Sequence, residues 1–179
     1  LAIEAHQHQH RQQAFFVPDI ASAVDHWVAT TGAGPFFLAP HHTTDWFRYR
    51  GEDVEADVSY AFGYAGDIQI QFIEQHDDTP SLYREMYADG EGGFHHVGVL
   101  ADDYDGERQR LLDQGFEIAT ELRADGATAV YFDTRASIGA YTEVHSTPER
   151  IMTTFERWKA AHHEWDGVTE PLRGRLPPA

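Results

Sequence analysis

Cysteine is absent from the sequence, which excludes disulfide bonds, thiolate metal sites and cysteine nucleophiles. Lysine is nearly absent, because Lys159 is the only one, so a Schiff-base mechanism on lysine is not expected. No apolar run approaches the roughly 20 residues that a membrane-spanning helix requires. The polar N-terminal residues also lack the pattern of a signal peptide. These absences together favour a cytoplasmic protein.

Positive charge is scarce relative to negative charge. The chain has 13 Lys and Arg residues against 30 Asp and Glu residues, and its formal net charge is −17. A surface of this charge repels phosphate backbones and anionic lipids, so we expect neither nucleic-acid nor membrane binding, and the expected partner is a small-molecule substrate. Hydrophobic residues make up 41% of the chain, which is enough for one packed core, so residues 1–179 are predicted to form a single domain.

The sequence contains one unit twice. The stretch Gly92–Asp105 reads as a loop, a strand that opens with two histidines, and the N-cap of a helix, and an earlier stretch beginning at Gln12 reads as a copy of it. A shift of 84 positions maps Gln12 to His96 and Asp19 to Asp103, and it keeps the apolar stripe of the following helix in phase. We therefore predict two copies of a strand–helix–strand–strand–strand module.

Periodicity and turn residues divide the chain into modules and elements. The first module is predicted over residues 12–75, a linker over 76–94, the second module over 95–145, and a C-terminal helix and tail over 146–179. Pro148 is expected to occupy the first position of that helix, capped by Ser146 or Thr147. Residues 41–50 are predicted to be a loop, and the predicted strands are 14–17, 36–39, 54–64, 68–74, 116–120, 128–132 and 140–144.

These features resemble the vicinal oxygen chelate superfamily. The resemblance rests on the paired βαβββ units, on Val17-Pro18-Asp19 after the first strand and on His95-His96-Val97-Gly98 at the start of the second half. The superfamily includes glyoxalase I, methylmalonyl-CoA epimerase, the extradiol dioxygenases and the bleomycin- and fosfomycin-resistance proteins, and the glyoxalase-like, epimerase-type branch is the most similar. The resemblance implies an α+β fold in which two modules form one curled mixed sheet around a central cup, in proteins that often pair as homodimers.

The resemblance also implies a set of metal ligands from the first and last strand of each module. The matching positions are Gln12, Gln71, His96 and Glu143. His96 directly precedes Val-Gly as in the superfamily, whereas Gln12 stands where a histidine is common. Two amides, an imidazole and a carboxylate suit one divalent ion, namely Mn²⁺, Co²⁺, Ni²⁺, Zn²⁺ or Fe²⁺, although the two neutral glutamines also fit a cup without metal. Such an ion stabilises the enediolate that forms when a proton alpha to a carbonyl is removed.

Strand parity adds residues that are expected to contact the substrate. His145 and Tyr141 share the strand face of Glu143, and Gln69 shares the face of Gln71. All three side chains should therefore line the cup.

The proton acceptor and the binding group for a substrate anion are predicted from charge. The acceptor is either Glu143, released from the metal, or an acidic residue of the third strand, Glu55 or Asp57. In the predicted loop, Arg48 or Arg50 is expected to pair with a substrate carboxylate or a CoA phosphate.

Four other histidines need a separate interpretation. His95 is expected to point away from the cup and to be structural. His6, His8 and His10 either belong to a frayed terminus or lie on one face of an extended strand, where His10 could replace Gln12 as a ligand.

Three functions fit this sequence. The first is a metal-dependent, glyoxalase-like lyase or an isomerase that acts alpha to a carbonyl, on a small molecule or a CoA ester. The second is a metal-free protein that binds an aromatic or lipophilic small molecule in the cup. The third is an extradiol dioxygenase, which needs two histidines and one carboxylate around Fe(II).

Overall fold

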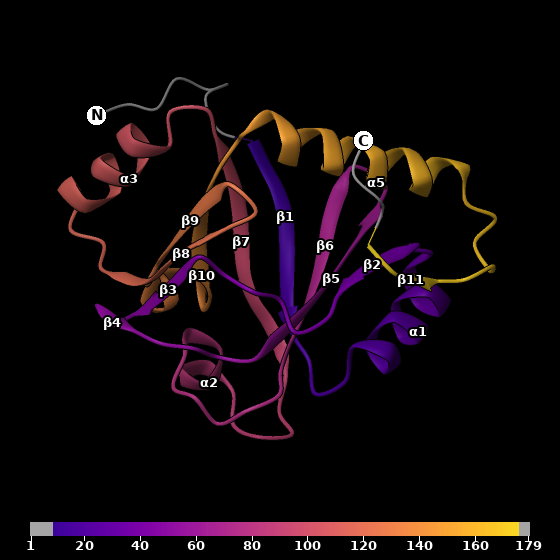
Figure 1. Ribbon diagram of the computed structural model, residues 1–179, viewed down its shortest axis with the longest axis horizontal. Helices are drawn as coiled ribbons and strands as arrows, with labels where there is room; N and C mark the ends of the chain where they lie inside the picture. Colours follow the sequence, from indigo (N-terminus) through magenta and orange to yellow (C-terminus); the bar gives the residue numbers. More distant parts are fainter. Residues whose placement is uncertain (1–8, 176–179) are drawn as a thin grey trace.

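A computed structural model of the chain describes residues 9–175, with side chains described from Arg11 onward. The described strands form one mixed sheet that curls around a central space (Figure 1). The predicted α+β fold with a cup is therefore confirmed. The predictions for His6 and His8, and for the side chain of His10, lie outside the described residues.

The two halves of the sheet each follow the predicted strand–helix–strand–strand–strand order. The first half contains β1 (Gln9–Phe16), α1 (Ile20–Thr31), β2 (Phe36–Ala39), β5 (Val58–Ala65) and β6 (Ile68–Gln75). The second half contains β7 (Gly93–Ala101), α3 (Tyr104–Asp113), β8 (Ile118–Ala124), β9 (Ala127–Phe132) and β10 (Tyr141–Ser146).

Further elements connect and extend these halves. They are β3 (Trp46–Tyr49), β4 (Glu52–Asp53), α2 (Leu82–Met86), α4 (Arg135–Ile138), α5 (Glu149–Glu164) and β11 (Leu172–Arg173). The strand order of the whole sheet is β11-β2-β5-β6-β1-β7-β10-β9-β8-β3-β4. The order runs outward from the central β1–β7 pair in the same way on both sides, so the two halves are related by an approximate two-fold axis.

An aspartate cap begins the helix of each module, as the sequence predicted. The carboxylate of Asp19 accepts a hydrogen bond from Ser22 N in front of α1, and that of Asp103 accepts one from Gly106 N in front of α3. The apolar stripe of each helix then packs against one face of its own half of the sheet. This packing leaves the opposite, inner face of the sheet free to form the cup.

A β-bulge interrupts the central antiparallel pair of β1 and β7. The register shifts after Ala14, and His95 becomes an extra residue on β7. The bulge changes the direction of its side chain, so His95 and His96 are both fully buried. His95 packs against the inner-face rings of Tyr83 and Tyr141. The expectation that His95 points away from the cup is therefore wrong, because simple strand alternation does not survive a bulge.

The first module sends β3 and β4 across to the second module. β3 pairs antiparallel with β8, with Trp46 opposite Arg123 and Tyr49 opposite Thr120. The prediction that residues 41–50 form a loop is therefore wrong for their second half. The partner of β3 lies far away in the sequence, so local patterns gave no sign of the pairing.

Helix α5 lies across one end of the cup, opposite α2 (Figure 1). Pro148 is its N-cap residue and makes no side-chain cap hydrogen bond, so its predicted position inside the helix is wrong. The hydroxyl of Thr147 is not available as a cap, because it donates to Asp102 Oδ1 at 2.9 Å. Within residues 9–175, no helix is long and apolar enough to cross a membrane.

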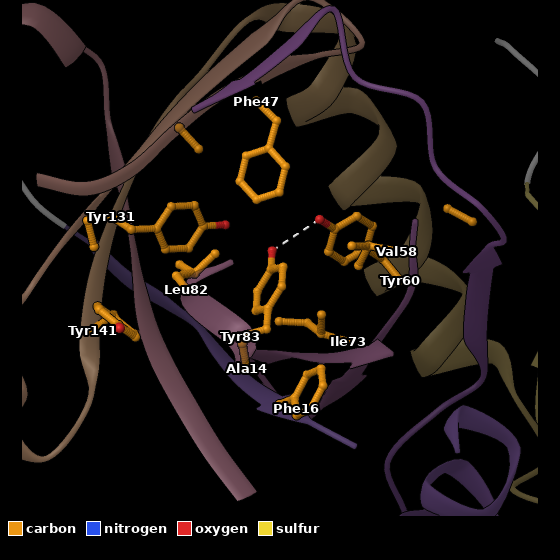
Figure 2. Packing of buried hydrophobic residues seen from close by; sticks show 13 residues of the cluster. Ala14, Phe16, Phe47, Val58, Tyr60, Ile73, Leu82, Tyr83, Tyr131 and Tyr141 are labelled. Carbon is orange, nitrogen blue, oxygen red and sulfur yellow. Dashed lines mark hydrogen bonds between the residues drawn. The ribbon is translucent and has the colours of Figure 1, made fainter. Parts of the chain in front are cut away.

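The end of the cup near α2 is filled by a large apolar cluster (Figure 2). Its rings include Tyr60, Tyr83 and Tyr131, whose hydroxyl groups point toward one another. The oxygens of Tyr60 and Tyr83 are 3.1 Å apart. The open part of the cup therefore lies between this cluster and α5.

Candidate functional site

The candidate metal ligands lie on the four central strands, in two neighbouring rows of the inner face. In strand order from β6 to β10 the rows are Gln69–Gln12–Gly98–Glu143 and Gln71–Ala14–His96–Tyr141. Each row places a small residue, Gly98 or Ala14, between two of the predicted ligands. The approximate two-fold axis relates these small residues to each other, so the space between the four ligands is built into the repeat.

The predicted ligands meet above Gly98. Nε2 of His96 lies 3.2 Å from Oε1 of Gln12 and 3.4 Å from Oε2 of Glu143. A Cβ atom added to Gly98 would lie 2.9 Å from Gln12 Oε1 and 3.1 Å from Glu143 Oε2. Only glycine at this position leaves both oxygens where they are.

Hydrogen bonds fix the orientation of two of these ligands. Gln12 Nε2 donates to Gln69 Oε1 at 2.6 Å, and Gln69 Nε2 donates to the hydroxyl of Tyr64 at 3.3 Å. These two hydrogen bonds turn Oε1 of Gln12 toward the imidazole ring of His96. On the other side, the hydroxyl of Tyr131 donates to Glu143 Oε1 at 2.7 Å and leaves Oε2 free to face the site.

His95 determines which nitrogen of His96 carries a proton. Nε2 of His95 lies 3.3 Å from the carbonyl oxygen of Leu82, which can only accept, so this nitrogen carries the hydrogen. Burial, followed by the nearby His96, holds the pKa of His95 well below its usual value, so its ring is neutral and its Nδ1 is an acceptor. The Nδ1 atoms of the two rings are 2.9 Å apart, so Nδ1–H of His96 donates. The lone pair of His96 Nε2 is thereby directed into the cup.

Three electron-rich atoms therefore converge in a buried place: Nε2 of His96, Oε1 of Gln12 and Oε2 of Glu143. Burial acts to raise the pKa of Glu143, whereas a proton on His96 Nε2 would donate to the carboxylate and, with its charge, hold the pKa of Glu143 below its usual value. A cation at this place therefore keeps Glu143 ionised. Three lone pairs that face one another repel unless a cation lies between them, either a proton on Nε2 or a metal ion.

The spacing of these atoms fits a metal ion. Neighbouring ligands of an octahedral ion with bonds of about 2.1 Å are about 3 Å apart, close to the separations measured around His96. Gln71 offers a further oxygen on the wall of the hollow that Gln12 and Glu143 also border, because its Oε1 is buried and has no hydrogen-bond partner. A buried carbonyl oxygen without a partner is unfavourable unless a ligand satisfies it. Gln12, Gln71, His96 and Glu143 together are thus a chemically suitable donor set.

Two hollows border this donor set. The first has a volume of about 120 Å³ and mostly apolar walls, which include Phe62, Phe155 and Trp158. The second, also about 120 Å³, lies toward the start of β1 and includes Arg11 and Lys159. The residues that border both hollows are Gln12, Glu143, His145 and Phe155. Gln12 and Glu143 of the donor set therefore lie where the two hollows adjoin, with His96 buried behind them.

The sequence from residue 11 to residue 132 matches the family model of the glyoxalase/bleomycin resistance protein/dioxygenase superfamily. The chain belongs to this superfamily. The resemblance inferred from the repeat and from the two-histidine strand is thus confirmed.

Several solved structures share the fold at low sequence identity. Methylmalonyl-CoA epimerase from Mycobacterium tuberculosis has a TM-score of 0.61 and 14% identity, over 85% of this chain and 97% of that chain. A hypothetical protein from Bacillus halodurans C-125 has a TM-score of 0.60 and 16% identity, over 79% and 96%. A Streptomyces coelicolor methylmalonyl-CoA epimerase in complex with 2-nitronate-propionyl-CoA has a TM-score of 0.56 and 17% identity, over 79% and 95%. No curated protein matches the sequence.

Of the residues predicted to contact the substrate, His145 lies at the hollows and Tyr141 does not. His145 borders both hollows. Its Nδ1 is 2.5 Å from the carbonyl oxygen of Ser146 and must carry a hydrogen, which leaves Nε2 as the nitrogen that can accept a proton. Tyr141 is fully buried beneath the guanidinium group of Arg135 and borders neither hollow. Its predicted contact with substrate is wrong, because Tyr141 lies at the start of β10, two residues before Glu143, in the filled end of the cup.

Gln69 borders the second hollow, as strand parity predicted, but its amide is used to orient Gln12. Glu55 does not reach the cup. It is exposed, between β4 and β5, and is absent from the walls of both hollows. The prediction of Glu55 as the proton acceptor is therefore wrong, because the third strand of the module starts only at Val58.

The two arginines predicted to bind a substrate anion are already paired with carboxylates. Arg48 is half exposed and its Nε donates to Asp53 at 2.8 Å. Arg50 forms ion pairs with Glu85 at 2.7 Å and with Asp133 at 2.6 Å. Neither arginine borders a hollow. The prediction fails because β3, with Arg48, and the turn after it, with Arg50, lie at the outer edge of the second module.

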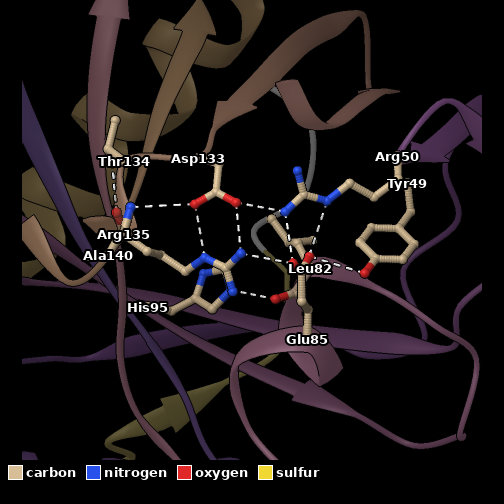
Figure 3. Close-up of polar contacts among 9 residues, drawn as sticks. All are labelled: Tyr49, Arg50, Leu82, Glu85, His95, Asp133, Thr134, Arg135 and Ala140. Atoms are coloured by element: carbon tan, nitrogen blue, oxygen red, sulfur yellow. Dashed lines mark hydrogen bonds and ion pairs between the residues drawn. The ribbon is translucent and has the colours of Figure 1, made fainter. Parts of the chain in front are cut away.

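Arg50 instead belongs to an ion-pair network that joins distant segments (Figure 3). Arg135 contacts the same two carboxylates as Arg50, Glu85 on α2 and Asp133 after β9. The hydrogen bond from Arg135 and the contact with Arg50 hold the pKa of Asp133 well below its usual value. The network therefore fastens β3, the linker and the second module together.

Sequence reasoning missed the tyrosines around Glu143. Tyr131 hydrogen bonds to the carboxylate, and burial raises the pKa of Tyr131 well above its usual value, so it stays a neutral donor. Parity on β9 and β10 could have found it, since Tyr131 pairs with Glu143. Tyr83 lies on α2 in the linker, and no sequence signal placed it in the cup.

A second group of possible metal ligands lies outside the cup. His41, Asp57 and His76 bring one donor atom each within 4.8 Å of the others. His41 Nδ1 is 2.7 Å from Asp57 Oδ1, with side chains that are 65% and 44% exposed. This exposed group supplies a useful control for any metal-binding measurement.

Proposed function

We propose that the chain is a metal-dependent lyase or isomerase that removes a proton alpha to a carbonyl of a small-molecule substrate. The convergence of the lone pairs of Gln12, His96 and Glu143 carries this proposal. One divalent ion, Mn²⁺, Co²⁺, Ni²⁺, Zn²⁺ or Fe²⁺, would be held by these residues and Gln71. When bound, such an ion supplies Lewis-acid stabilisation of negative charge on substrate oxygens.

The remaining steps belong to the side chains of the cup. His145 Nε2 is an acceptor on the wall of both hollows and takes the proton from the substrate carbon. Tyr131 holds Glu143 in place. The apolar side chains of α5 that line the first hollow, among them Phe155 and Trp158, exclude water, and this strengthens every charge interaction in the cup. The two methylmalonyl-CoA epimerases that share the fold are consistent with an isomerase.

Each chain contains the whole donor set, because β1, β6, β7 and β10 are neighbours in one sheet. The homodimer implied by the resemblance would therefore carry two complete and separate sites. No residue of a second chain is required for the proposed chemistry.

Metal binding tests the donor set directly. The full chain carrying His6→Gln, His8→Gln and His10→Gln is reconstituted with Co²⁺, and bound cobalt is measured by calorimetry and visible absorption. We expect one ion in the cup, lost in His96→Ala and in Glu143→Gln. His76→Ala is the matched control, because it removes only the exposed group. Cobalt binding that is unchanged in both cup variants contradicts the proposal.

Proton exchange tests the reaction. The metal-loaded protein is incubated in D₂O with carbonyl compounds that carry an alpha hydrogen, and exchange is followed by NMR. We expect exchange that is lost in Glu143→Gln together with the metal. In His145→Gln, exchange should be lost while bound cobalt is retained. Full exchange in His145→Gln would show that another group accepts the proton.

A metal-free binding protein is the second candidate function. The observation that favours it is that a proton on His96 Nε2 would also satisfy Gln12 and Glu143, as a buried ion pair. A thermal-shift screen separates the two candidates: stabilisation by aromatic ligands and by no divalent metal supports the binding protein. The dioxygenase alternative requires a second imidazole ligand, and it predicts oxygen uptake with catechols after anaerobic Fe(II) loading.

A further inference from the structure

Helix α5 closes the cup from above and is attached to both modules. It follows directly after β10 of the second module. At its other end, Nδ1 of His162 lies 2.5 Å from the carbonyl oxygen of Gly34, and Nζ of Lys159 lies 2.5 Å from Asp67 Oδ1. Because these contacts hold both ends, helix α5, which we call the roof of the cup, is a fixed part of the cavity wall. Its inner residues therefore decide what fits beside the donor set.

The roof presents an aromatic wall to the first hollow. The ring of Trp158 stacks on that of Phe62 with centroids 4.9 Å apart and an interplanar angle of 13°. Phe155 stacks on Trp158 at 5.6 Å. Nε1 of Trp158 is buried without a hydrogen-bond partner. Aromatic rings that wall a narrow space favour another aromatic ring in offset-stacked or edge-to-face contact with them.

The volume of the first hollow limits the size of its occupant. An apolar cavity of about 150 Å³ is known to hold one benzene molecule. The first hollow, at about 120 Å³, is of the same order. It therefore has room for one ring or a branched chain of similar size, and not for a long acyl chain or a nucleotide.

The second hollow differs in its charge. Its wall includes Arg11, which has no ion-pair partner among the described residues, Lys159, which is paired with Asp67 at 2.5 Å, and the carboxylate of Glu143. Glu156 also borders it. One small anionic group can be accommodated there. The several phosphates of CoA cannot be matched in a chain with a net charge of −17, where Arg175 beside the first hollow is already paired with Asp125 at 3.0 Å.

We propose that the cup takes a compact 2-oxo carboxylate carrying one aromatic ring, and that α5 excludes CoA thioesters. The ring lies against Trp158 and Phe155, the carboxylate lies toward Arg11, and the carbonyl oxygen lies over the donor set between the hollows. This inference rests on the proposed function for the role of the donor set. It departs from the substrates of the epimerases that share the fold, because it follows from the roof and not from the sheet.

Calorimetry with three ligands tests this assignment on the cobalt-loaded full chain. Phenylpyruvate has the ring and the oxo acid, pyruvate lacks the ring, and methylmalonyl-CoA carries the nucleotide. We expect phenylpyruvate to bind at least about tenfold more tightly than pyruvate, since one tenfold step corresponds to about 1.4 kcal/mol. Methylmalonyl-CoA should show no binding at the same concentrations.

Variants of α5 assign the selectivity to the roof. Trp158→Ala should remove most of the preference for phenylpyruvate over pyruvate and leave pyruvate binding unchanged. Trp158→Phe, which keeps a flat ring, should retain part of the preference and guards against simple loss of folding. Arg150→Ala, an exposed change on the same helix, is the matched control.

The outcomes separate this inference from the proposed function. If methylmalonyl-CoA binds more tightly than phenylpyruvate and undergoes proton exchange, the substrate class is wrong while the proposed function stands. If phenylpyruvate binds with the expected preference but shows no exchange and no dependence on metal, the proposed function fails while the selectivity of the roof stands. An equal affinity for phenylpyruvate and pyruvate overturns the inference.

Discussion

Substitution of Gly98 by alanine tests whether the empty space between the ligands is essential. The added Cβ would lie 2.8 Å from the Cβ of Gln12, a distance that real Cβ atoms essentially never show. It would also lie 2.9 Å from Gln12 Oε1 and 3.1 Å from Glu143 Oε2. Gln12 Cβ is close to the backbone and cannot turn away, so β1 and β7 must separate.

The structure sets the expected magnitude. Overpacking of this kind typically destabilises a protein by about 1–3 kcal/mol. Alanine in a strand recovers about 0.5–1 kcal/mol of that, because glycine loses more conformational entropy on folding. The melting temperature of a domain of this size falls by about 2–4 °C for each kcal/mol, so we expect a decrease of a few degrees. Cobalt affinity should fall much further, since both displaced oxygens belong to the proposed donor set.

Two other glycines separate the effect on the site from the effect on stability. A Cβ at Gly63 would lie 2.7 Å from the ring of Phe36, away from the donor set, so Gly63→Ala should destabilise the fold and keep cobalt affinity. A Cβ at Gly174 meets nothing within 4 Å, so Gly174→Ala should change neither property. Urea unfolding and cobalt calorimetry are the assays. If Gly98→Ala binds cobalt as tightly as the parent chain, the proposed geometry of the donor set is refuted.

Three further changes test other parts of the reasoning. His95→Leu removes the acceptor of His96 Nδ1–H. We expect urea unfolding to show a free energy of unfolding lower by about 1–3 kcal/mol, and calorimetry to show cobalt affinity about 10–100-fold lower. An unchanged cobalt affinity contradicts the assignment of the tautomer. Asp133→Asn should cost on the order of 2 kcal/mol at pH 7. The pKa of Asp133 is depressed in the folded state. Its contribution to the free energy of unfolding is therefore present above the unfolded pKa of about 3.9 and is lost as the pH falls toward the folded value. The urea midpoint of the variant should accordingly vary less with pH in that range than the midpoint of the parent chain. Glu55→Gln should leave cobalt binding and proton exchange unchanged, and any loss of exchange would return Glu55 to the site.

The sequence predicts the fold well because the fold is a repeat. Asp19 and Asp103 cap equivalent helices, and Gln12 and His96 occupy equivalent strands, so each copy supports the interpretation of the other. Period-two alternation then places Glu143 and His145 on the inner face. What alternation cannot give is the bulge at His95, since one extra residue reverses the direction of a side chain without leaving a mark in the composition.

The parts of the site that sequence reasoning missed depend on contacts between distant segments. The stripe of Phe155 and Trp158 is visible in the sequence as a core-facing helix, but only the path of α5 across both modules turns that stripe into a cavity wall. The path of β3 likewise removes Arg50 from the cup, because its pairing with β8 is decided in three dimensions. Sequence patterns identify which face of an element is buried. The fold determines which other element packs against that face.

The unequal halves of the donor set have a chemical consequence. The approximate two-fold axis relates neutral Gln12 to His96 and neutral Gln71 to Glu143, so only one of the four ligands carries a charge. A divalent ion held there would keep a net charge of about +1, whereas a site with two carboxylates would be neutral. A net positive centre favours the anionic form of a substrate over the neutral one, and most strongly where water is excluded. The Glu143→Gln variant removes that single charge, and for this reason it is expected to lose the ion outright and not merely to weaken it.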